Sequence, residues 1–400
     1  MPSPVSSGHI VLFEPDPSGH RMVYVRYIVE AMARRGTLRA TLVTSARGAA
    51  SPILRDLDPA AAACLSTVTI DDPATLPGVP AKLQRQFGHV ARLRRAVRQL
   101  SGHDPVDQVF VPFLDDYGLL PLAVHRRPFG ALPWSGIMIR PRFHLAAMGA
   151  QVPPRPVDRV EGWAYRRHLR SPTLATMFSI DPHLAPYLDD PRVVSLPDPA
   201  DITQVTADRA WLGVADDAVV LLVYGYIDGR KAIDRLLSVA ADPRMPKALV
   251  IALVGTQDPA MAPVLAAPDA QRLRSEGRIV EVARHVSDQE EASAFARADI
   301  VWAYYPGSYC SSGAMVRAGQ MERPILGGDE GLVGHLTRQQ GSGLTAPEHD
   351  DDALFAALSR LAGDASLRRT LGAAGRRAFA ASTGAAFGDA IVGRLEETRA

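Results

Sequence analysis

Short apolar runs alternate with helical patterns along the first half of the chain, which predicts buried strands with helices between them. The run at residues 10–13 is followed by a loop rich in Pro, Asp, Ser and Gly, and a helical pattern then extends from Met22 to Arg35 and ends at Gly36. Continuous apolar runs are typical of parallel strands that are buried on both faces. Further runs of this kind lie at residues 40–44, 68–70, 108–113 and 136–139.

The same alternation starts again after a proline-rich, polar stretch at residues 195–206, which is the expected connection between two domains. The length of 400 residues also fits two α/β domains of about 200 residues each. We therefore predict two doubly wound, parallel-sheet (Rossmann-like) domains, at residues 1–200 and 201–400, with the last helix able to pack back on the first domain. Because active sites of open α/β sheets lie at the carboxyl ends of strands, the domains should face a cleft. The strands expected in the second half lie at residues 219–224, 249–254, 279–282, 300–303 and 324–326.

The composition is that of a globular protein, with 47% hydrophobic and 22% charged residues. The two cysteines, Cys64 and Cys310, cannot form a disulfide framework, and no His or Cys pair has the spacing of metal ligands. No run approaches the roughly 18 apolar residues of a membrane span, and residues 1–9 lack a signal-peptide pattern. We therefore expect a cytoplasmic protein without a protein-held metal, and we expect no nucleic-acid partner.

The net charge of +1 conceals an uneven distribution of charge. Residues 1–200 hold 23 Lys and Arg against 17 Asp and Glu, whereas residues 201–400 hold 21 against 26. The basic half could face an anionic acceptor or a membrane. Ordinary variation between two domain surfaces explains the difference equally well.

The segment at residues 223–237 combines the end of a buried strand with a basic pair at the start of a helix. The strand ends in Gly225, and Arg230 and Lys231 open the next helix. A helix N-terminus and a fixed positive charge together suit a diphosphate, because backbone N–H groups and the cation point at the same place. The alternative is a basic pair on a solvated first turn.

A second segment, at residues 298–326, has the order strand, polar loop, helix and strand. Its loop carries hydroxyl groups and close-approach backbone N–H groups at a helix start, which again suit a phosphate. An ordinary N-cap is the alternative interpretation. Both loops follow strands of the same predicted sheet, and this shared location favours the phosphate hypothesis. The residues concerned are Ser308, Ser311, Ser312 and Gly313.

In the order and spacing of these segments, the chain resembles the retaining glycosyltransferases of family 4, which have the glycosyltransferase B fold. The resemblance implies a hexosyl transfer from a nucleoside diphosphate sugar held by residues 201–400 to a glycan, lipid-linked or small-molecule acceptor held by residues 1–200, in polysaccharide or glycoconjugate biosynthesis. It also implies that Lys231 binds the donor diphosphate, with Arg230 beside it. The matching positions are Gly225 with Arg230 and Lys231, residues 253–255, residues 298–303 with Pro306, and residues 317–325, 328–331 and 341–347.

Three positions depart from the pattern of the family. Tyr309 and Arg317 stand where the family has two glutamates of its donor loop, and Tyr226 replaces a cation after Gly225. A guanidinium can pair with phosphate or carboxylate but cannot accept hydrogen bonds from a ribose, so Arg317 is expected to point into the cleft toward an anionic donor group. The departures keep two alternatives open, namely a non-catalytic glycosyltransferase-like subunit or sensor, and an enzyme with a remodelled donor such as a cyclitol.

Candidate acid–base residues of the first half lie at strand ends. Asp115 and Asp116 follow the strand at residues 108–113 and could orient or deprotonate an acceptor hydroxyl, or cap a helix. Arg140, Arg142 and His144 follow the next strand, where they suit an anionic acceptor or a leaving phosphate, or form a solvated loop. The remaining candidate is His20, in the first loop.

Residues 81–100 form a basic amphipathic pattern with six Lys and Arg and no acid. Leu83, Phe87, Val90 and Val97 fall on one helical face. Such a helix can rest on the anionic inner face of a membrane, which would make the protein peripheral there. It can also be an ordinary domain helix whose apolar face lies in the core.

Overall fold

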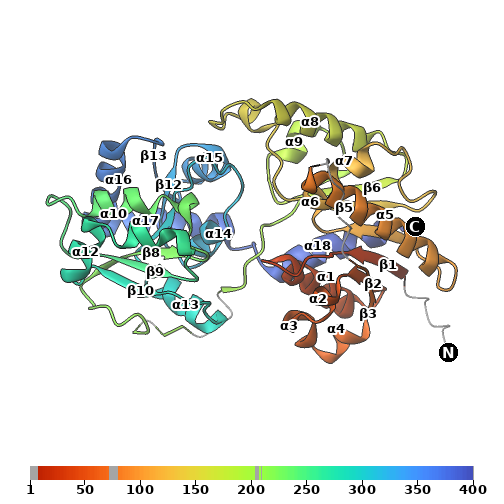
Figure 1. Cartoon of the computed structure of the whole chain (residues 1–400), viewed down its shortest axis with the longest axis horizontal. Helices are drawn as coiled ribbons and strands as arrows, with labels where there is room; N and C mark the ends of the chain where they lie inside the picture. The colour runs from red at the N-terminus through yellow and green to blue at the C-terminus, as the bar shows by residue number, and fades with distance from the viewer. Residues whose placement is uncertain (1–7, 72–79, 203–206, 209, 400) are drawn as a thin grey trace. The chain divides into compact units, whose positions relative to one another are not determined.

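The computed structural model describes residues 8–71, 80–202, 207–208 and 210–399 (Figure 1). The chain divides into two compact units. Unit 1 comprises residues 1–144, 154–197 and 384–400, and unit 2 comprises residues 145–153 and 198–383. The chain therefore leaves unit 1 twice, for residues 145–153 and for residues 198–383, and returns to it at residue 384.

Unit 1 contains a seven-stranded sheet in the order β3-β2-β1-β4-β5-β6-β7, and all of its strand pairs are parallel. The strands predicted in the first half fall on β1 to β5, whereas β6 and β7 were not predicted. The elements are β1 (Gly8–Phe13), α1 (Arg21–Arg35), β2 (Leu38–Thr44), α2 (Ala46–Ala49), α3 (Pro52–Arg55), α4 (Pro59–Ala63), β3 (Leu65–Thr69), α5 (Ala81–Ser101), β4 (Gln108–Val111), α6 (Leu114–Tyr117), α7 (Leu119–Ala123), β5 (Trp134–Met138), α8 (Pro156–Leu169), β6 (Leu174–Ser179), α9 (Leu184–Leu188), β7 (Val193–Ser195) and α18 (Gly384–Glu397).

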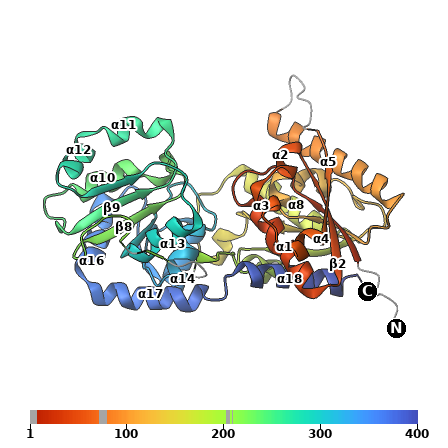
Figure 2. The same cartoon turned by 90° about the horizontal axis from the view of Figure 1, so that it is seen from below.

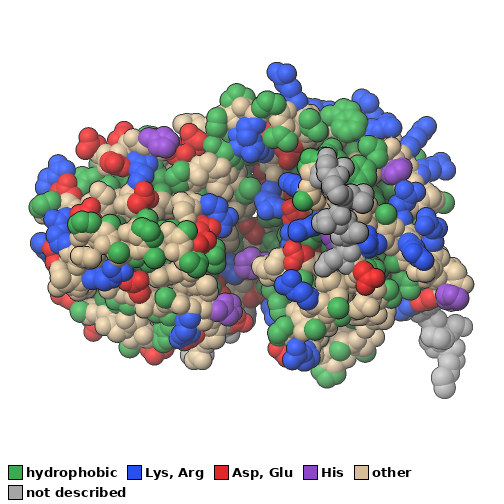
Figure 3. Space-filling model, viewed as in Figure 1, with side chains coloured by type: hydrophobic (Ala, Val, Ile, Leu, Met, Phe, Trp, Pro, Cys, Tyr) green, Lys and Arg blue, Asp and Glu red, His purple; other side chains and the backbone are tan. Residues whose placement is uncertain are grey.

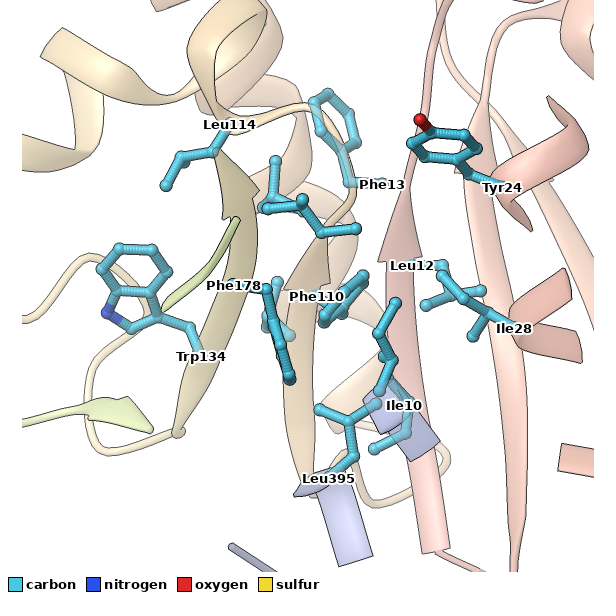
Figure 4. Close-up of a cluster of buried hydrophobic side chains, with 14 of the residues drawn as sticks. Ile10, Leu12, Phe13, Tyr24, Ile28, Phe110, Leu114, Trp134, Phe178 and Leu395 are labelled. Atoms are coloured by element: carbon cyan, nitrogen blue, oxygen red, sulfur yellow. The ribbon is translucent and has the colours of Figure 1, made fainter. Parts of the chain in front are cut away.

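The core of unit 1 is completed by the last helix of the chain. Helix α18 packs along α1, as Figure 2 shows. Gly388 allows this close approach, because a Cβ atom there would lie 2.2 Å from the carbonyl oxygen of Tyr27. Farther along α18, Leu395 reaches the strand side chains around Ile10 (Figure 4). Residues from both ends of the chain therefore share one hydrophobic core.

Unit 2 contains a six-stranded parallel sheet in the order β10-β9-β8-β11-β12-β13. The strands predicted in the second half coincide with β8 to β12, and β13 is an addition. The elements are β8 (Val219–Tyr224), α10 (Ile233–Ala240), β9 (Leu249–Val254), α11 (Ala262–Leu265), α12 (Pro268–Ser275), β10 (Ile279–Val282), α13 (Asp288–Arg297), β11 (Ile300–Ala303), α14 (Gly313–Gln320), β12 (Ile325–Gly328), α15 (Gly331–Gln340), β13 (Gly343–Ala346), α16 (Asp351–Gly363) and α17 (Ala365–Phe379).

The basic segment at residues 81–100 forms α5, and its apolar face is used inside unit 1. Val90, Leu93 and Val97 are buried in the core, whereas Phe87 is exposed. The domain-helix alternative therefore accounts for most of the apolar face of this segment. Within the described ranges, no helix combines the length and the apolar character that a membrane crossing requires.

Candidate functional site

The carboxyl end of β8 carries a buried lysine. Gly225 adopts φ of 95°, a left-handed conformation that suits glycine, and the short helix η3 (Gly229–Lys231) follows. The side chain of Lys231 turns inward, is only 8% exposed, and donates a hydrogen bond from Nζ to the carbonyl oxygen of Tyr224 at 2.9 Å. Its Nζ also lies 5.0 Å from the ring centroid of Tyr305, which follows β11. Lys231 thus places a positive charge between the ends of two neighbouring strands.

The other members of this loop are turned differently. The Arg230 side chain is 71% exposed and pairs with Asp228 of its own loop at 2.8 Å. The Tyr226 side chain is half exposed, and its hydroxyl donates to Asp258 at 3.1 Å. The predicted basic pair is therefore split, since Lys231 lies inside the loop and Arg230 lies on its surface.

The loop after β11 is held by its own hydroxyl groups. Ser311 donates from Oγ to the carboxylate of Asp198, and Ser312 donates from Oγ to the Tyr305 hydroxyl at 3.3 Å. Helix α14 then starts at Gly313, where the first N–H groups of a helix have no acceptor within the helix. The hydroxyl groups of Ser311 and Ser312 are therefore used to fix the loop.

Two further residues of this loop have backbone roles. The amide of Ser308 donates to the carbonyl oxygen of Tyr305 at 3.0 Å and closes a tight turn. Tyr309 accepts a hydrogen bond at its carbonyl oxygen from the amide of Leu332, at 3.2 Å. Tyr309 therefore packs against the start of α15, where Gly331 leaves room for its backbone.

Arg317 is bound by a carboxylate from the neighbouring helix. Its Nε pairs with Oε1 of Glu291 on α13, and its Nη1 donates to the carbonyl oxygen of Gly313 at 3.2 Å. The side chains of Arg317 and Glu291 are 15% and 13% exposed. Burial raises the pKa of the nearby Asp198 carboxyl, and the hydrogen bond from Ser311 and the positive charge of Arg317 oppose this shift. Acids are thus present near position 317, but they come from α13 and from the connection before β8.

In unit 1, the carboxylate of Asp115 joins neighbouring elements through hydrogen bonds. Its carboxylate accepts hydrogen bonds from the amides of Ile139 and Arg140, at 2.6 and 2.7 Å, and from the Tyr165 hydroxyl at 2.9 Å. Burial raises the pKa of this carboxyl, and the hydrogen bonds oppose the shift. Both carboxylate oxygens are therefore used to join the end of β5 and α8 to α6.

Asp116 belongs to a polar cluster that the sequence analysis did not identify. Arg21 of α1 pairs with Asp116 and donates to the Tyr117 hydroxyl at 2.6 Å, and that hydroxyl donates to Glu14 at 3.0 Å. Glu14 is fully buried directly after β1. The cluster borders a pocket of about 320 Å³ that is lined by Asp16, Arg21, Ala81, Lys82, Arg85, Asp116 and Tyr117.

The remaining candidates of unit 1 have different surroundings. His144 is fully buried, with Nε2 3.0 Å from the Asp181 carboxylate, and Arg142 is buried and paired with Asp158 at 3.3 Å. Arg140 is half exposed and joins the cluster through its ion pair with Asp116. His20 is exposed just before α1, where its carbonyl oxygen accepts the first helical hydrogen bond. Arg140 thus contacts the polar cluster through Asp116.

Among the described residues, no group of three or more His, Cys, Asp or Glu side chains is arranged to hold a metal ion.

Glu14 makes the stability of the protein dependent on pH. Burial raises the pKa of Glu14 from 4.5 to about 8, with Arg21 opposing the shift. The stability that this group contributes is complete below pH 4.5 and is lost as the pH rises toward 8, by at most about 1.4 kcal/mol per pH unit. Glu14→Gln should remove this loss, so its melting temperature should exceed that of the wild type increasingly from pH 5 to 8.

The control for this measurement is Asp56→Asn, which replaces an exposed acid elsewhere in unit 1. Its melting temperature should differ from that of the wild type by a constant amount between pH 5 and 8. Parallel curves for Glu14→Gln and the wild type would contradict the assignment.

Comparisons with known proteins identify the fold. No protein-family model matches the chain, and no curated protein sequence matches it significantly. Sucrose-phosphate synthase from Thermosynechococcus elongatus is similar in structure, with a TM-score of 0.67, 19% identity and 98% of each chain covered. HepE from Anabaena, solved in complex with UDP, has a TM-score of 0.67 and 14% identity, over 98% of this chain and 100% of that chain.

A third similar structure is WaaG, a glycosyltransferase involved in lipopolysaccharide biosynthesis. It has a TM-score of 0.62 and 14% identity, and the match covers 96% of this chain and 98% of that chain. The chain thus has the glycosyltransferase B fold, with two parallel-sheet α/β units, and the predicted fold class is confirmed.

Proposed function

We propose that this protein is a glycosyltransferase that moves a sugar from a nucleoside diphosphate sugar, held by unit 2, to a hydroxyl of an acceptor held by unit 1. The observation that carries the proposal is the buried ammonium of Lys231 at the carboxyl end of β8. Open α/β sheets bind ligands at that edge. The similar HepE structures, which contain UDP or UDP-glucose, support a nucleotide-sugar donor.

The chemistry of the donor side follows from where negative charge develops. Departure of a nucleoside diphosphate concentrates charge on its phosphates, and groups that stabilise this charge accelerate the reaction. Lys231 would supply a fixed cation, and the backbone N–H groups at the start of α14 would supply hydrogen bonds. Retention of configuration is part of the proposal and rests on the resemblance to family 4.

The acceptor side is proposed to be the pocket beside Arg21 and Asp116. A carboxylate such as Asp116 can accept a hydrogen bond from an acceptor hydroxyl and orient it. Lys82 and Arg85 add positive charge to the lining, which suits a glycan, lipid-linked or small-molecule acceptor with an anionic group. Asp115 has no such role in the proposal, because it is not among the residues that line this pocket.

Two alternatives have a specific observation in their favour. The donor loop has Tyr309 and Arg317 where the resembling family has glutamates, and Arg317 is neutralised by Glu291. A non-catalytic subunit or sensor would tolerate this loss. An enzyme with a remodelled donor, such as a cyclitol, would use the replaced side chains to bind that donor.

A panel of nucleoside diphosphate sugars separates these alternatives. We expect at least one to raise the melting temperature and to be slowly hydrolysed, because water can replace the acceptor in a competent site. A thermal shift without turnover would identify a sensor. The absence of both effects with every common donor would contradict the proposal and favour a remodelled donor.

A cytoplasmic location, peripheral on the inner face of a membrane, remains part of the proposal. Residues 81–100 provide positive charge for it, but most of their apolar side chains lie in the core. Phe87 is the large apolar side chain of this segment that is half exposed.

A further inference from the structure

Helix α8 carries three large apolar side chains that are about half exposed. Val157, Val160 and Trp163 are 55%, 47% and 50% exposed. Val160 and Trp163 are three residues apart and are neighbours on the outward side of the helix, whereas Val157 is exposed at the helix start. The side opposite Trp163 carries Tyr165 and His168, which are buried in unit 1. The helix is therefore anchored by one side and presents Val160 and Trp163 on the other.

The same outward side carries positive charge. Arg159, Arg166 and Arg170 are exposed and fall on the arc of the helix that contains Trp163. The two acids of the helix are turned toward the protein. Asp158 pairs with arginines outside the helix, and Glu161 accepts hydrogen bonds from two backbone amides of the β5–α8 connection, at 3.0 and 3.1 Å. The outward side of α8 is thus built from Val, Trp and Arg.

The elements next to α8 also expose apolar and positively charged side chains. Helix α7 packs against both α8 and α5, and Val124 directly after α7 is half exposed. Hydrophobic and Lys or Arg side chains alternate on this part of the surface in Figure 3. Helix α5 contributes six Lys and Arg and no acid. Exposed apolar side chains within a broadly cationic surface are complementary to a bilayer that contains anionic lipids.

We propose that the outward side of α8, defined as Arg159, Val160, Trp163, Arg166 and Arg170, docks on the headgroup region of a membrane that contains anionic lipids. Trp163 would lie at the level of the headgroups, where its ring is partly buried and its indole N–H stays hydrated. The arginines would attract lipid phosphates while their stems cover apolar surface. The docking is independent of the donor chemistry proposed above.

The test uses the full-length protein and Trp163 as a natural reporter. The chain has four tryptophans, of which Trp134 and Trp302 are fully buried and Trp211 is partly buried. We expect the protein to sediment with phosphatidylcholine vesicles that contain phosphatidylglycerol, and to be released as salt rises, because salt screens the attraction. The fluorescence should shift to the blue and should be quenched by brominated acyl chains.

Two variants locate the contact. Trp163→Glu should weaken vesicle binding by about tenfold or more, because it places an acid against an anionic surface. Trp163→Phe should keep the binding but lose the blue shift and the quenching. The matched control is Phe87→Glu, which adds the same charge at a side chain of α5 with similar exposure (47%) and should preserve most of the binding. Unchanged melting temperatures would show that all three variants fold.

Three outcomes would overturn the proposal. The first is equal binding to neutral and anionic vesicles, or binding to neither. The second is a loss of binding in Phe87→Glu as large as that in Trp163→Glu. The third is a concentration-dependent dimer in sedimentation experiments that Trp163→Glu abolishes, because a second copy of the chain would then be the occupant of this surface.

Discussion

Replacing Lys231 by alanine should lower the affinity for nucleoside diphosphates by about tenfold or more. The ammonium is buried, so solvent screens its field only weakly, and it lies where the ends of β8 and β11 meet. Loss of a charge-assisted hydrogen bond costs roughly 1.5 to 3 kcal/mol, which corresponds to a rise in Kd of about 10- to 150-fold. Titration calorimetry with UDP and the other nucleoside diphosphates measures the effect.

Lys231 also has a structural role that the experiment must separate from binding. Its Nζ donates to the carbonyl oxygen of Tyr224, so Lys231→Ala should also lower the melting temperature. Lys231→Met keeps the apolar stem, fills most of the space and removes only the charge. The matched control is Arg230→Ala, because Arg230 is adjacent, exposed and paired with Asp228. Equal losses of affinity in Arg230→Ala and Lys231→Met, or no loss in either, would rule out the assignment.

Arg317→Glu should destabilise the protein by about 3 kcal/mol. The new carboxylate would face Glu291 and lie near Asp198, with the cation that now neutralises them removed. Breaking a buried ion pair costs roughly 3 to 5 kcal/mol, and the lower end applies because both partners keep some contact with solvent. For a unit of this size the melting temperature should fall by roughly 6 to 12 °C.

A double variant in which the two charges are exchanged distinguishes loss of the ion pair from a steric effect of the substitution. Arg317→Glu combined with Glu291→Arg restores an ion pair between α14 and α13 and should recover much of the lost stability. Arg317→Met removes the cation without adding an acid and should lie between the wild type and Arg317→Glu. A melting temperature of Arg317→Glu within about 1 °C of the wild type would show that the pair contributes little, as for an exposed ion pair.

The same variants test whether Arg317 contacts the donor. If Arg317 contacts an anionic group of the donor, the charge swap should restore stability while nucleotide affinity and activity stay low. If the arginine only joins two helices, affinity should recover together with stability. Binding of common nucleotide sugars by Arg317→Glu that exceeds that of the wild type would indicate that the position governs donor choice.

The strands of both sheets were predictable where apolar runs are continuous, and less so elsewhere. Strand β6 (Leu174–Ser179) includes two polar residues, and β7 has only three residues, so neither gives a clear run. The backbone amide of the buried Thr176 donates, at 3.1 Å, to Oγ of Ser135, which is distant in the sequence. A local pattern of hydrophobicity therefore could not identify these strands.

The candidate site was predictable only where its residues are close in sequence. Lys231 was identified because a strand end and a helix start enclose it. The cluster of Glu14, Arg21 and Tyr117 was missed, because it forms only when β1 and β4 become neighbours in the sheet. The one available signal was an acid directly after the first strand, at a position that lies at the carboxyl edge of a parallel sheet.

The discontinuity of unit 1 has a consequence for synthesis of the protein. Seven strands of its sheet emerge from the ribosome before residue 198, but α18, which covers α1, follows only after residue 383. At 5 to 20 residues per second, making the intervening segment takes roughly 10 to 40 s. During that time the apolar side of α1 that Phe387 and Ile391 later cover stays open to chaperones and to aggregation. A released chain truncated before residue 384 should therefore hold a folded unit 2 and an N-terminal unit that proteases still cleave.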